Sequence, residues 1–180
     1  MKNKCSLMRL KIFSYKKINS TNDLALKKIK NGVNQGIILS ETQKKGRGQY
    51  GKKWISKKGN IFLTIFFQVS KKKKLIKLTM ENCSNIKKIL SSIVGKKITI
   101  KPPNDLLIDK RKFCGILQES FFKNNLKFLI LGLGINLINS PLIKGYRTTY
   151  IQKYNKNVNK KVIIDRLKKS YEKKINYFNT

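Results

Sequence analysis

The chain has 180 residues, of which 40% are hydrophobic, and its formal net charge is +34 because 42 Lys+Arg stand against 8 Asp+Glu. This length and apolar content suffice for one domain with its own core. The chain has no histidine. Histidine general bases, serine–histidine triads and imidazole metal sites are therefore excluded, and any chemistry must use lysine, arginine, carboxylates, amides or a bound metal ion.

The three cysteines, Cys5, Cys83 and Cys114, are odd in number and far apart in the sequence. They predict neither a disulfide framework nor a zinc site, so we expect a reducing, cytoplasmic compartment. Cys114 lies in the apolar run 113–117 and is expected to be buried. No apolar stretch approaches the ~18–20 residues of a membrane span, and the N-terminus lacks the uninterrupted apolar region of a signal peptide. We therefore expect no membrane partner.

The positive charge has two explanations. One is a nucleic acid or another anionic partner. The other is compositional drift, since the excess is mostly lysine, is accompanied by many asparagines and isoleucines, and is spread over the chain. A module for single-stranded nucleic acid needs basic side chains interleaved with exposed aromatics. Here the aromatics lie mainly in apolar runs such as 62–67, so we favour drift and expect no specific nucleic-acid partner.

The chain starts with an alternating segment, 10–15, that predicts a strand. The sequence NSTND then predicts a helix start, because Ser20 followed three residues later by Asp23 resembles a capping box. Gly32 is expected to end this helix. A helix N-terminus also binds anions and polar ligands, so the segment is either a plain cap or part of a site.

A glycine-rich polar segment, ETQKKGRGQYGKKW, occupies residues 41–54 between two apolar runs. Arg47 stands between Gly46 and Gly48, and a guanidinium on a pliable glycine hinge suits a carboxylate or a phosphate. We interpret the segment as an anion-binding loop that becomes ordered around its ligand. A solvated basic hairpin loop is the alternative.

The same segment contains the GxGxxG spacing of a dinucleotide-binding fingerprint. That fingerprint needs a strand before it, a helix after it and an acid about 20 residues further on. Here residues 52–56 and the apolar run from Ile61 predict strand, and no acid lies between Glu41 and Glu81. We therefore reject a dinucleotide site.

The rest of the chain alternates between strand and helix patterns. Residues 71–74 predict a turn, and the helix that follows, from 75 to about 94, has an apolar face at helical spacing. A second amphipathic helix is predicted over 162–178. The expected strands are 36–43, 60–69, 97–101, 113–120 and 127–133. The expected inward face of the first of these helices comprises Leu78, Ile86, Ile89, Leu90 and Ile93.

Four segments, in this order, resemble the biotin protein ligase family over roughly residues 10 to 140. They are Asn19–Asn22, the loop of residues 41–54, KPPNDL at 101–106 followed by RKFCGIL at 111–117, and GLGIN at 132–136. The resemblance implies an α+β fold, with a mixed β-sheet and helices mainly on one face, like the class II aminoacyl-tRNA synthetases and biotin synthetase. It also implies that residues 1–180 form a single catalytic domain. Neither an N-terminal helix-turn-helix domain nor a C-terminal β-barrel is expected.

The resemblance implies catalytic roles for Lys112 and Arg47, which would hold the reacting carboxylate and phosphate. Without it, Lys112 would be interpreted as one more solvated lysine. Asn104 and Asp105 either orient the ligand or cap a turn. The implied biotin-binding residues are Ser20, Thr21, Asn22, Gln43, Gly46, Arg47, Gly48, Gln49, Lys112 and Gly115. The implied nucleotide-binding residues are Arg47, Gln49, Lys112 and Asn136.

Two positions depart from the family pattern. Pro102 stands where a tryptophan is usual, so the packing beneath the site is expected to differ. Gln49 stands where many members have a second arginine. Glutamine keeps hydrogen bonding but loses a charge, which predicts weaker retention of an adenylate intermediate.

The implied reaction is an ATP-dependent ligation. Biotin, the substrate, would form biotinyl-5′-AMP with ATP, and Mg²⁺ would be held by the phosphates. A lysine of a carrier protein would then accept the biotinyl group, by default the biotin carboxyl carrier protein of acetyl-CoA carboxylase. The alternatives are a lipoate or other acyl ligase, a basic nucleic-acid-binding module and an inactive remnant. A lipoate ligase would be expected to carry an Arg-x-x-Gly-Gly-Gly segment, which the sequence lacks.

Overall fold

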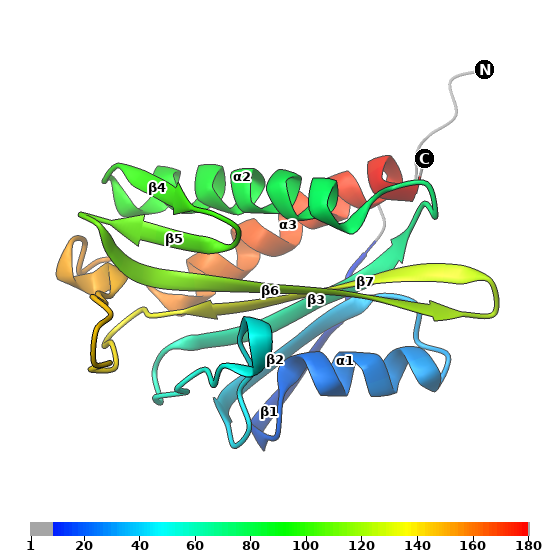
Figure 1. Cartoon of the computed structure of the whole chain (residues 1–180), viewed down its shortest axis with the longest axis horizontal. Coiled ribbons are helices and arrows are strands. Elements are labelled where there is room, and N and C mark those ends of the chain that lie inside the picture. Colours follow the sequence, from blue (N-terminus) through cyan, green and yellow to red (C-terminus); the bar gives the residue numbers. More distant parts are fainter. Residues whose placement is uncertain (1–8, 180) are drawn as a thin grey trace.

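The computed structural model describes residues 9–179, so Cys5 lies outside the described residues. One seven-stranded sheet forms the centre of the molecule, with helices on both of its faces (Figure 1). The strands are β1 (Ile12–Ile18), β2 (Gly36–Gln43), β3 (Ile61–Val69), β4 (Ile98–Lys101), β5 (Asp105–Ile108), β6 (Arg111–Lys123) and β7 (Leu126–Ile135). The α-helices are α1 (Thr21–Lys30), α2 (Leu75–Val94) and α3 (Lys160–Asn179).

The sheet is mixed, with the spatial order β1-β2-β3-β7-β6-β5-β4. β1 and β2 run parallel, and every other neighbouring pair is antiparallel. The central pairing joins β3 to β7 over their full lengths, from Ile61 opposite Ile135 to Val69 opposite Lys127. The predicted α+β class with a mixed sheet is confirmed.

Two helices cover one face of the sheet and one helix covers the other. α2 and α3 lie together on one side, and α1 lies alone on the opposite side (Figure 1). The larger core fills the α2/α3 side, and a smaller cluster around Ala25 and Ile29 fills the space beneath α1. The prediction that helices lie mainly on one face is therefore confirmed.

β7 shows how one strand serves both faces. Successive side chains of a strand point to opposite sides. Leu129, Leu131, Leu133 and Ile135 belong to the larger core. The alternate positions begin with Phe128 and Ile130, in the α1 cluster, and continue with Gly132 and Gly134. On the α1 side of β7, the first half of the strand therefore carries apolar side chains, and the second half exposes backbone at the two glycines.

The helix boundaries follow from local chemistry. Ser20 caps α1, and its side-chain oxygen accepts a hydrogen bond from the Asp23 N–H, as the capping pattern predicted. α2 has the bounds that its periodicity predicted, and it ends at Gly95, which adopts the left-handed conformation at φ 70°. Of its predicted inward residues, Leu78, Ile86 and Leu90 are fully buried, while Ile89 and Ile93 are half-buried.

Several strand predictions were wrong in extent. The first strand was predicted over 10–15, but β1 covers 12–18, because Leu10 is instead buried with its N–H donating to Glu172. Residues 52–56 were predicted as strand. They form only an isolated bridge, between Lys53 and Arg47, after a 3₁₀ turn at Gln49–Gly51. No α-helix follows this turn before β3, so the rejection of a dinucleotide fingerprint stands.

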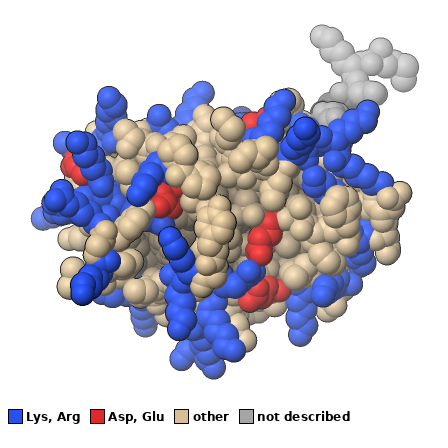
Figure 2. All heavy atoms as spheres, viewed as in Figure 1, with Lys and Arg blue, Asp and Glu red and all other residues tan. Residues whose placement is uncertain are grey.

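Positive charge is present on every side of the face that Figure 2 shows. Lysines and arginines project all around its edge, while much of its middle is uncharged and carries a few acidic side chains (Figure 2). Six of the nine phenylalanines are buried, for example Phe62, Phe66 and Phe67. Within residues 9–179, no helix combines the length and the apolar character needed to cross a bilayer.

Candidate functional site

A cavity of about 740 Å³ opens between segments that are far apart in the sequence. Its walls come from the N-terminus of α1, the loop after β2, the turn between β4 and β5, the start of β6, the end of β7 and the segment that follows β7. The predicted site residues that line it are Ser20, Thr21, Asn22, Gln43, Arg47, Gly48, Gln49, Asn104, Asp105, Lys112, Gly115 and Asn136. Gly46 is the one predicted residue that does not line it; it is buried against Trp54, whose N–H donates to the Gly46 carbonyl at 2.9 Å.

Neutral polar groups gather at the start of α1. The Thr21 N–H and the Thr21 hydroxyl both donate to Gln43 Oε1, at 2.8 and 3.1 Å. Gln43 Nε2 in turn donates to the Ser56 hydroxyl at 3.2 Å. A side chain with both an acceptor and a donor suits a neutral ligand such as an amide or a urea group.

Asn22 is held on three sides by the protein. Its Oδ1 accepts from the Thr64 hydroxyl at 2.6 Å, and its Nδ2 donates to Glu119 Oε2 at 2.7 Å. A Cβ on Gly132 would lie 2.2 Å from Asn22 Oδ1, so only glycine leaves room for this side chain. Asn22 therefore ties α1 to the sheet beneath the cavity.

Arg47 pairs with two carboxylates. Its guanidinium makes two parallel contacts with Glu119, at 3.0 and 2.9 Å, and a third with Asp23 at 2.8 Å. Burial alone would lower the pKa of Arg47, but the hydrogen bonds and charges of Glu119 and Asp23 outweigh burial and raise that pKa. Arg47 therefore stays charged and connects the glycine-rich loop to α1 and β6.

Trp54 packs on two glycines of the sheet. A Cβ on Gly134 would lie 2.3 Å from Trp54 Cε2, and a Cβ on Gly115 would lie 2.7 Å from Trp54 Cζ3. The indole Nε1 is buried, and no partner for it exists among the described residues. The two glycines thus form a flat floor, and the loop tryptophan lies against it.

Lys112 lies at the start of β6 and forms an ion pair with Asp105 of β5, with 2.7 Å between Nζ and Oδ1. Only 21% of the lysine side chain and 12% of the aspartate side chain is exposed. Asp105 Oδ2 also accepts a hydrogen bond from the Tyr146 hydroxyl at 2.6 Å. The structure therefore brings together two residues that the sequence singled out, and it adds a tyrosine from beyond β7.

Two asparagines present amides at the cavity wall. Asn136 Nδ2 donates to the Thr149 carbonyl at 3.1 Å, while its Oδ1 is buried and has no partner among the described residues. Asn104 Nδ2 donates to the Ile116 carbonyl at 2.7 Å. Asn104 therefore secures the turn onto β6, whereas Asn136 retains a free acceptor.

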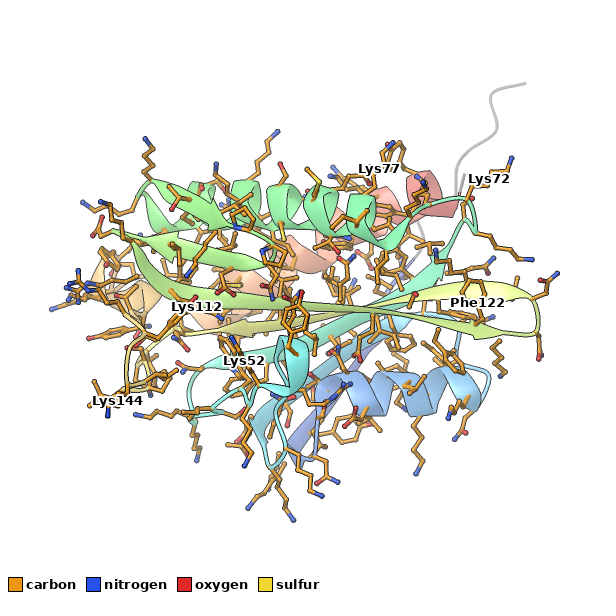
Figure 3. All side chains as sticks on the ribbon, viewed as in Figure 1. Lys52, Lys72, Lys77, Lys112, Phe122 and Lys144 are labelled. Carbon is orange, nitrogen blue, oxygen red and sulfur yellow. The ribbon has the colours of Figure 1, made fainter. Side chains whose placement is uncertain are left out.

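The cavity is strongly cationic. Asp105 is the only carboxylate among the described residues that line it. Lys52, Lys112 and Lys144 come from three separate segments and lie at the same end of the molecule (Figure 3). Such an excess of positive charge attracts anionic ligands. The six cationic side chains in the wall are Arg47, Lys52, Lys53, Lys101, Lys112 and Lys144.

Sequence reasoning missed four residues of this site. Asp23 and Glu119 pair with Arg47, and Trp54 and Tyr146 line the cavity. Trp54 had a signal, because it ends the glycine-rich loop and is the only tryptophan in the chain. The other three are set by contacts over long sequence separations, which no local pattern encodes.

The sequence matches a protein-family model, described as the biotin/lipoate A/B protein ligase family, over residues 14–136. The chain belongs to this biotin/lipoate protein ligase family. The matched region runs from within β1 to just past the end of β7 and includes every lining residue named above except Lys144 and Tyr146.

A curated relative of this chain agrees with the family model. The chain is 32% identical over 123 residues to the bifunctional ligase/repressor BirA of Escherichia coli, an alignment covering 67% of this chain and 38% of BirA. The chain thus matches well under half of that relative's length.

Solved ligase structures share the fold. A biotin protein ligase from Aquifex aeolicus, in complex with biotin and ATP, has a TM-score of 0.75 at 24% identity, covering 94% of this chain and 73% of that chain. A biotin protein ligase from Leishmania major, in complex with biotin, has a TM-score of 0.77 at 18% identity, covering 94% and 81%. The fold predicted from the resemblance is confirmed.

Proposed function

We propose that this chain activates biotin with ATP and transfers the biotinyl group to a lysine of a carrier protein, with the biotin carboxyl carrier protein of acetyl-CoA carboxylase as the expected acceptor. The observation that carries the proposal is the composition of the cavity. One wall offers the neutral Thr21–Gln43 pair, and six cations surround a single carboxylate. Biotin has a neutral ureido ring and an anionic carboxylate, and ATP adds a polyanion, so each part has a matching group.

In the first step, a biotin carboxylate oxygen bonds to the α-phosphorus of ATP, the bond from that phosphorus to the bridging oxygen breaks, and pyrophosphate leaves. The protein needs no nucleophile of its own for this step. Arg47 and Lys112 would hold the two anions together and stabilise the charge that develops on the α-phosphate. Arg47 would exchange Glu119 or Asp23 for substrate as it does so.

In the second step, the amine of the acceptor lysine attacks the acyl carbon of biotinyl-5′-AMP, and AMP leaves. The anhydride must be protected from water until the acceptor arrives. The loop from Gly46 to Trp54 is suited to this task, because most of its residues line the cavity and its three glycines allow it to move. The Asn136 Oδ1 acceptor is suited to an amino group of the adenine.

Mg²⁺ would enter as a component of the ATP substrate. Among residues 9–179 no cluster of three carboxylate or cysteine side chains is able to hold a metal ion, and the cavity's one carboxylate already pairs with Lys112. The phosphates of ATP are therefore the better ligands. Since ATP and free biotin are the substrates and the buried cysteines are free thiols, we assign the activity to the cytoplasm.

The test is ATP–pyrophosphate exchange with purified protein, Mg²⁺ and either biotin or lipoate, with Lys112→Ala as the control. We expect exchange that depends on biotin and that Lys112→Ala reduces by at least about 100-fold, the loss typical of removing a charge that stabilises the transition state. Exchange with lipoate alone would assign the chain to the lipoate branch of the family. A folded protein that exchanges with neither acid would refute the proposal.

A further inference from the structure

The ammonium of Lys112 is surrounded by three side chains. Its Nζ lies 2.7 Å from Asp105 Oδ1, 5.3 Å from the centre of the Trp54 ring and 5.5 Å from the centre of the Tyr146 ring. A free lysine side chain has many rotamers, and holding it in one position costs conformational entropy. Asp105, Trp54 and Tyr146 are able to hold the ammonium in one position only if other contacts hold their own side chains in place.

Asp105 is itself held through its second oxygen. Oδ1 faces Lys112, while Oδ2 accepts the Tyr146 hydroxyl at 2.6 Å. The carboxylate thus bridges the phenol and the ammonium, and its rotation would break both contacts. A hydrogen bond from a hydroxyl to a carboxylate is stronger than one between neutral groups.

The segment that carries Tyr146 also forms hydrogen bonds with the backbone of Lys112. The Lys112 N–H donates to the Arg147 carbonyl at 2.9 Å, and the Thr149 N–H donates to the Lys112 carbonyl at 2.9 Å. These two bonds form a short parallel bridge between Lys112 and Thr148. Tyr146 therefore stands at a fixed register beside the lysine, and is not a chance neighbour on a loose loop.

We propose that Tyr146 is a positioning residue for the ligase reaction: through Asp105 it orients the Lys112 ammonium toward the reacting carboxylate and phosphate. This inference rests on the proposed function, but it adds a residue outside the matched family region of 14–136. The Tyr146 ring contributes as well, since Lys101 Nζ lies 4.9 Å from its centre. The phenol thus organises two of the six cations of the cavity.

The hydroxyl is suited to this role because it stays protonated. Burial, followed by the hydrogen bond to Asp105 and the charge of that carboxylate, raises the pKa of Tyr146 to about 12. At neutral pH the phenol is therefore protonated and donates to Asp105.

The decisive variant is Tyr146→Phe, which removes the hydroxyl and keeps the ring. We expect kcat of biotin-dependent exchange to fall about 10-fold, while KM for biotin changes less than about 2-fold. The lost hydroxyl affects the orientation of the Lys112 ammonium and not the binding of the biotin ring. The fall should disappear in an Asp105→Ala background, because residues that act through one another are not additive. Tyr154→Phe is the matched control, since its hydroxyl lies on the same segment and accepts a hydrogen bond from the Thr149 hydroxyl at 3.3 Å, and its loss should leave kcat unchanged.

A second readout needs no turnover. Trace acetylation of the folded protein, read by mass spectrometry, reports how freely each lysine reacts. We expect Lys112 to react about 3-fold faster in Tyr146→Phe, since its pairing with Asp105 is loosened, while Lys53 is unchanged. Equal Lys112 reactivity in the two proteins, or a fall in kcat that persists in full without Asp105, overturns the inference. Absence of exchange in the parent protein would instead count against the proposed function, with the acetylation result still deciding the role of Tyr146.

Discussion

Arg47 donates to both carboxylate oxygens of Glu119, at 3.0 and 2.9 Å, although the two residues are 72 positions apart. Asp23 adds a third contact to the same guanidinium. The two carboxylates balance the charge of the guanidinium and hold it in one position. Arg47 is thus positioned by α1 and β6 before any substrate is present.

Glu119→Gln should loosen the loop. The substitution removes the charge that aligns the two parallel contacts with Arg47, so the backbone amides of residues 46–54 should exchange hydrogen about 3- to 10-fold faster, as expected for the loss of about 1 kcal/mol of local stability. Hydrogen exchange followed by mass spectrometry measures this. Glu41→Gln makes the same charge change at an exposed position and should have no such effect on the loop. Unchanged exchange in Glu119→Gln would show that the ion pair does not hold the loop.

Gly134→Ala should displace Trp54. The added Cβ would lie 2.3 Å from the indole, a distance that forces the ring or the strand to move. Because Trp54 is the only tryptophan in the chain, its emission maximum reports the movement directly. We expect a red shift and at least a 10-fold loss of biotin-dependent exchange, roughly the effect of 1–3 kcal/mol of overpacking. Ser84→Ala, on an exposed position of α2, should change neither quantity.

Gln49→Arg should improve retention of the adenylate. Gln49 lines the cavity, and an arginine there would add a seventh cation near the phosphate. We expect lower biotin labelling of a bystander protein, by about 3- to 10-fold, at equal rates of pyrophosphate exchange, since a charged hydrogen bond contributes about 1 kcal/mol more than a neutral one. Bystander labelling that is equal in the two proteins would end the idea that Gln49 weakens retention of the adenylate.

The stability of the chain should depend on Glu172. Burial alone would raise the pKa of this carboxyl, but hydrogen bonds from Lys168 and from the Leu10 N–H outweigh burial and lower it below its ordinary value of 4.5. A lowered pKa means that the stabilisation is complete above about pH 4.5 and is lost as the pH falls through the folded-state pKa. Glu172→Gln should therefore reduce the free energy of unfolding by about 1–3 kcal/mol at pH 7 and by much less at pH 3.

Urea denaturation at both pH values measures this difference. Asp165→Asn is the control, because its ion pair with Lys161 is exposed and should contribute little to stability. A Glu172→Gln deficit that is equal at the two pH values would rule out the ionised carboxylate as its source.

Most of the secondary structure followed from local pattern. α2 and β2 have their predicted bounds. The 3.6-residue period of α2 is uninterrupted, the apolar run of β2 is continuous, and turn residues flank each of them. β6 and β7 were predicted too short, since their ends are held by pairing with neighbouring strands: β6 pairs with β7 from Cys114 opposite Ile135 to Lys123 opposite Leu126, and Arg111 and Lys112 pair with β5. Pairing of this kind is a tertiary effect that propensity does not contain.

The site was less accessible to sequence reasoning. Lys112 could be singled out only by family resemblance, because it is one of a large excess of lysines. Its partner Asp105 was proposed, but without a choice between a turn cap and an orienting group, and the pairing favours the second. Tyr146 lies in a segment without periodicity, so nothing in its surroundings marked it before the chain was folded.

The alternation along β7 assigns core packing and cavity shape to different residues of one strand. Its core-facing leucines are packed against α2 and α3, whereas Gly132 and Gly134 face the cavity on the other side of the same strand. Backbone is shared between the two faces, but side chains are not. A substitution on the glycine side would therefore disturb the cavity first, through Asn22 or Trp54, whereas a substitution on the leucine side would disturb the larger core.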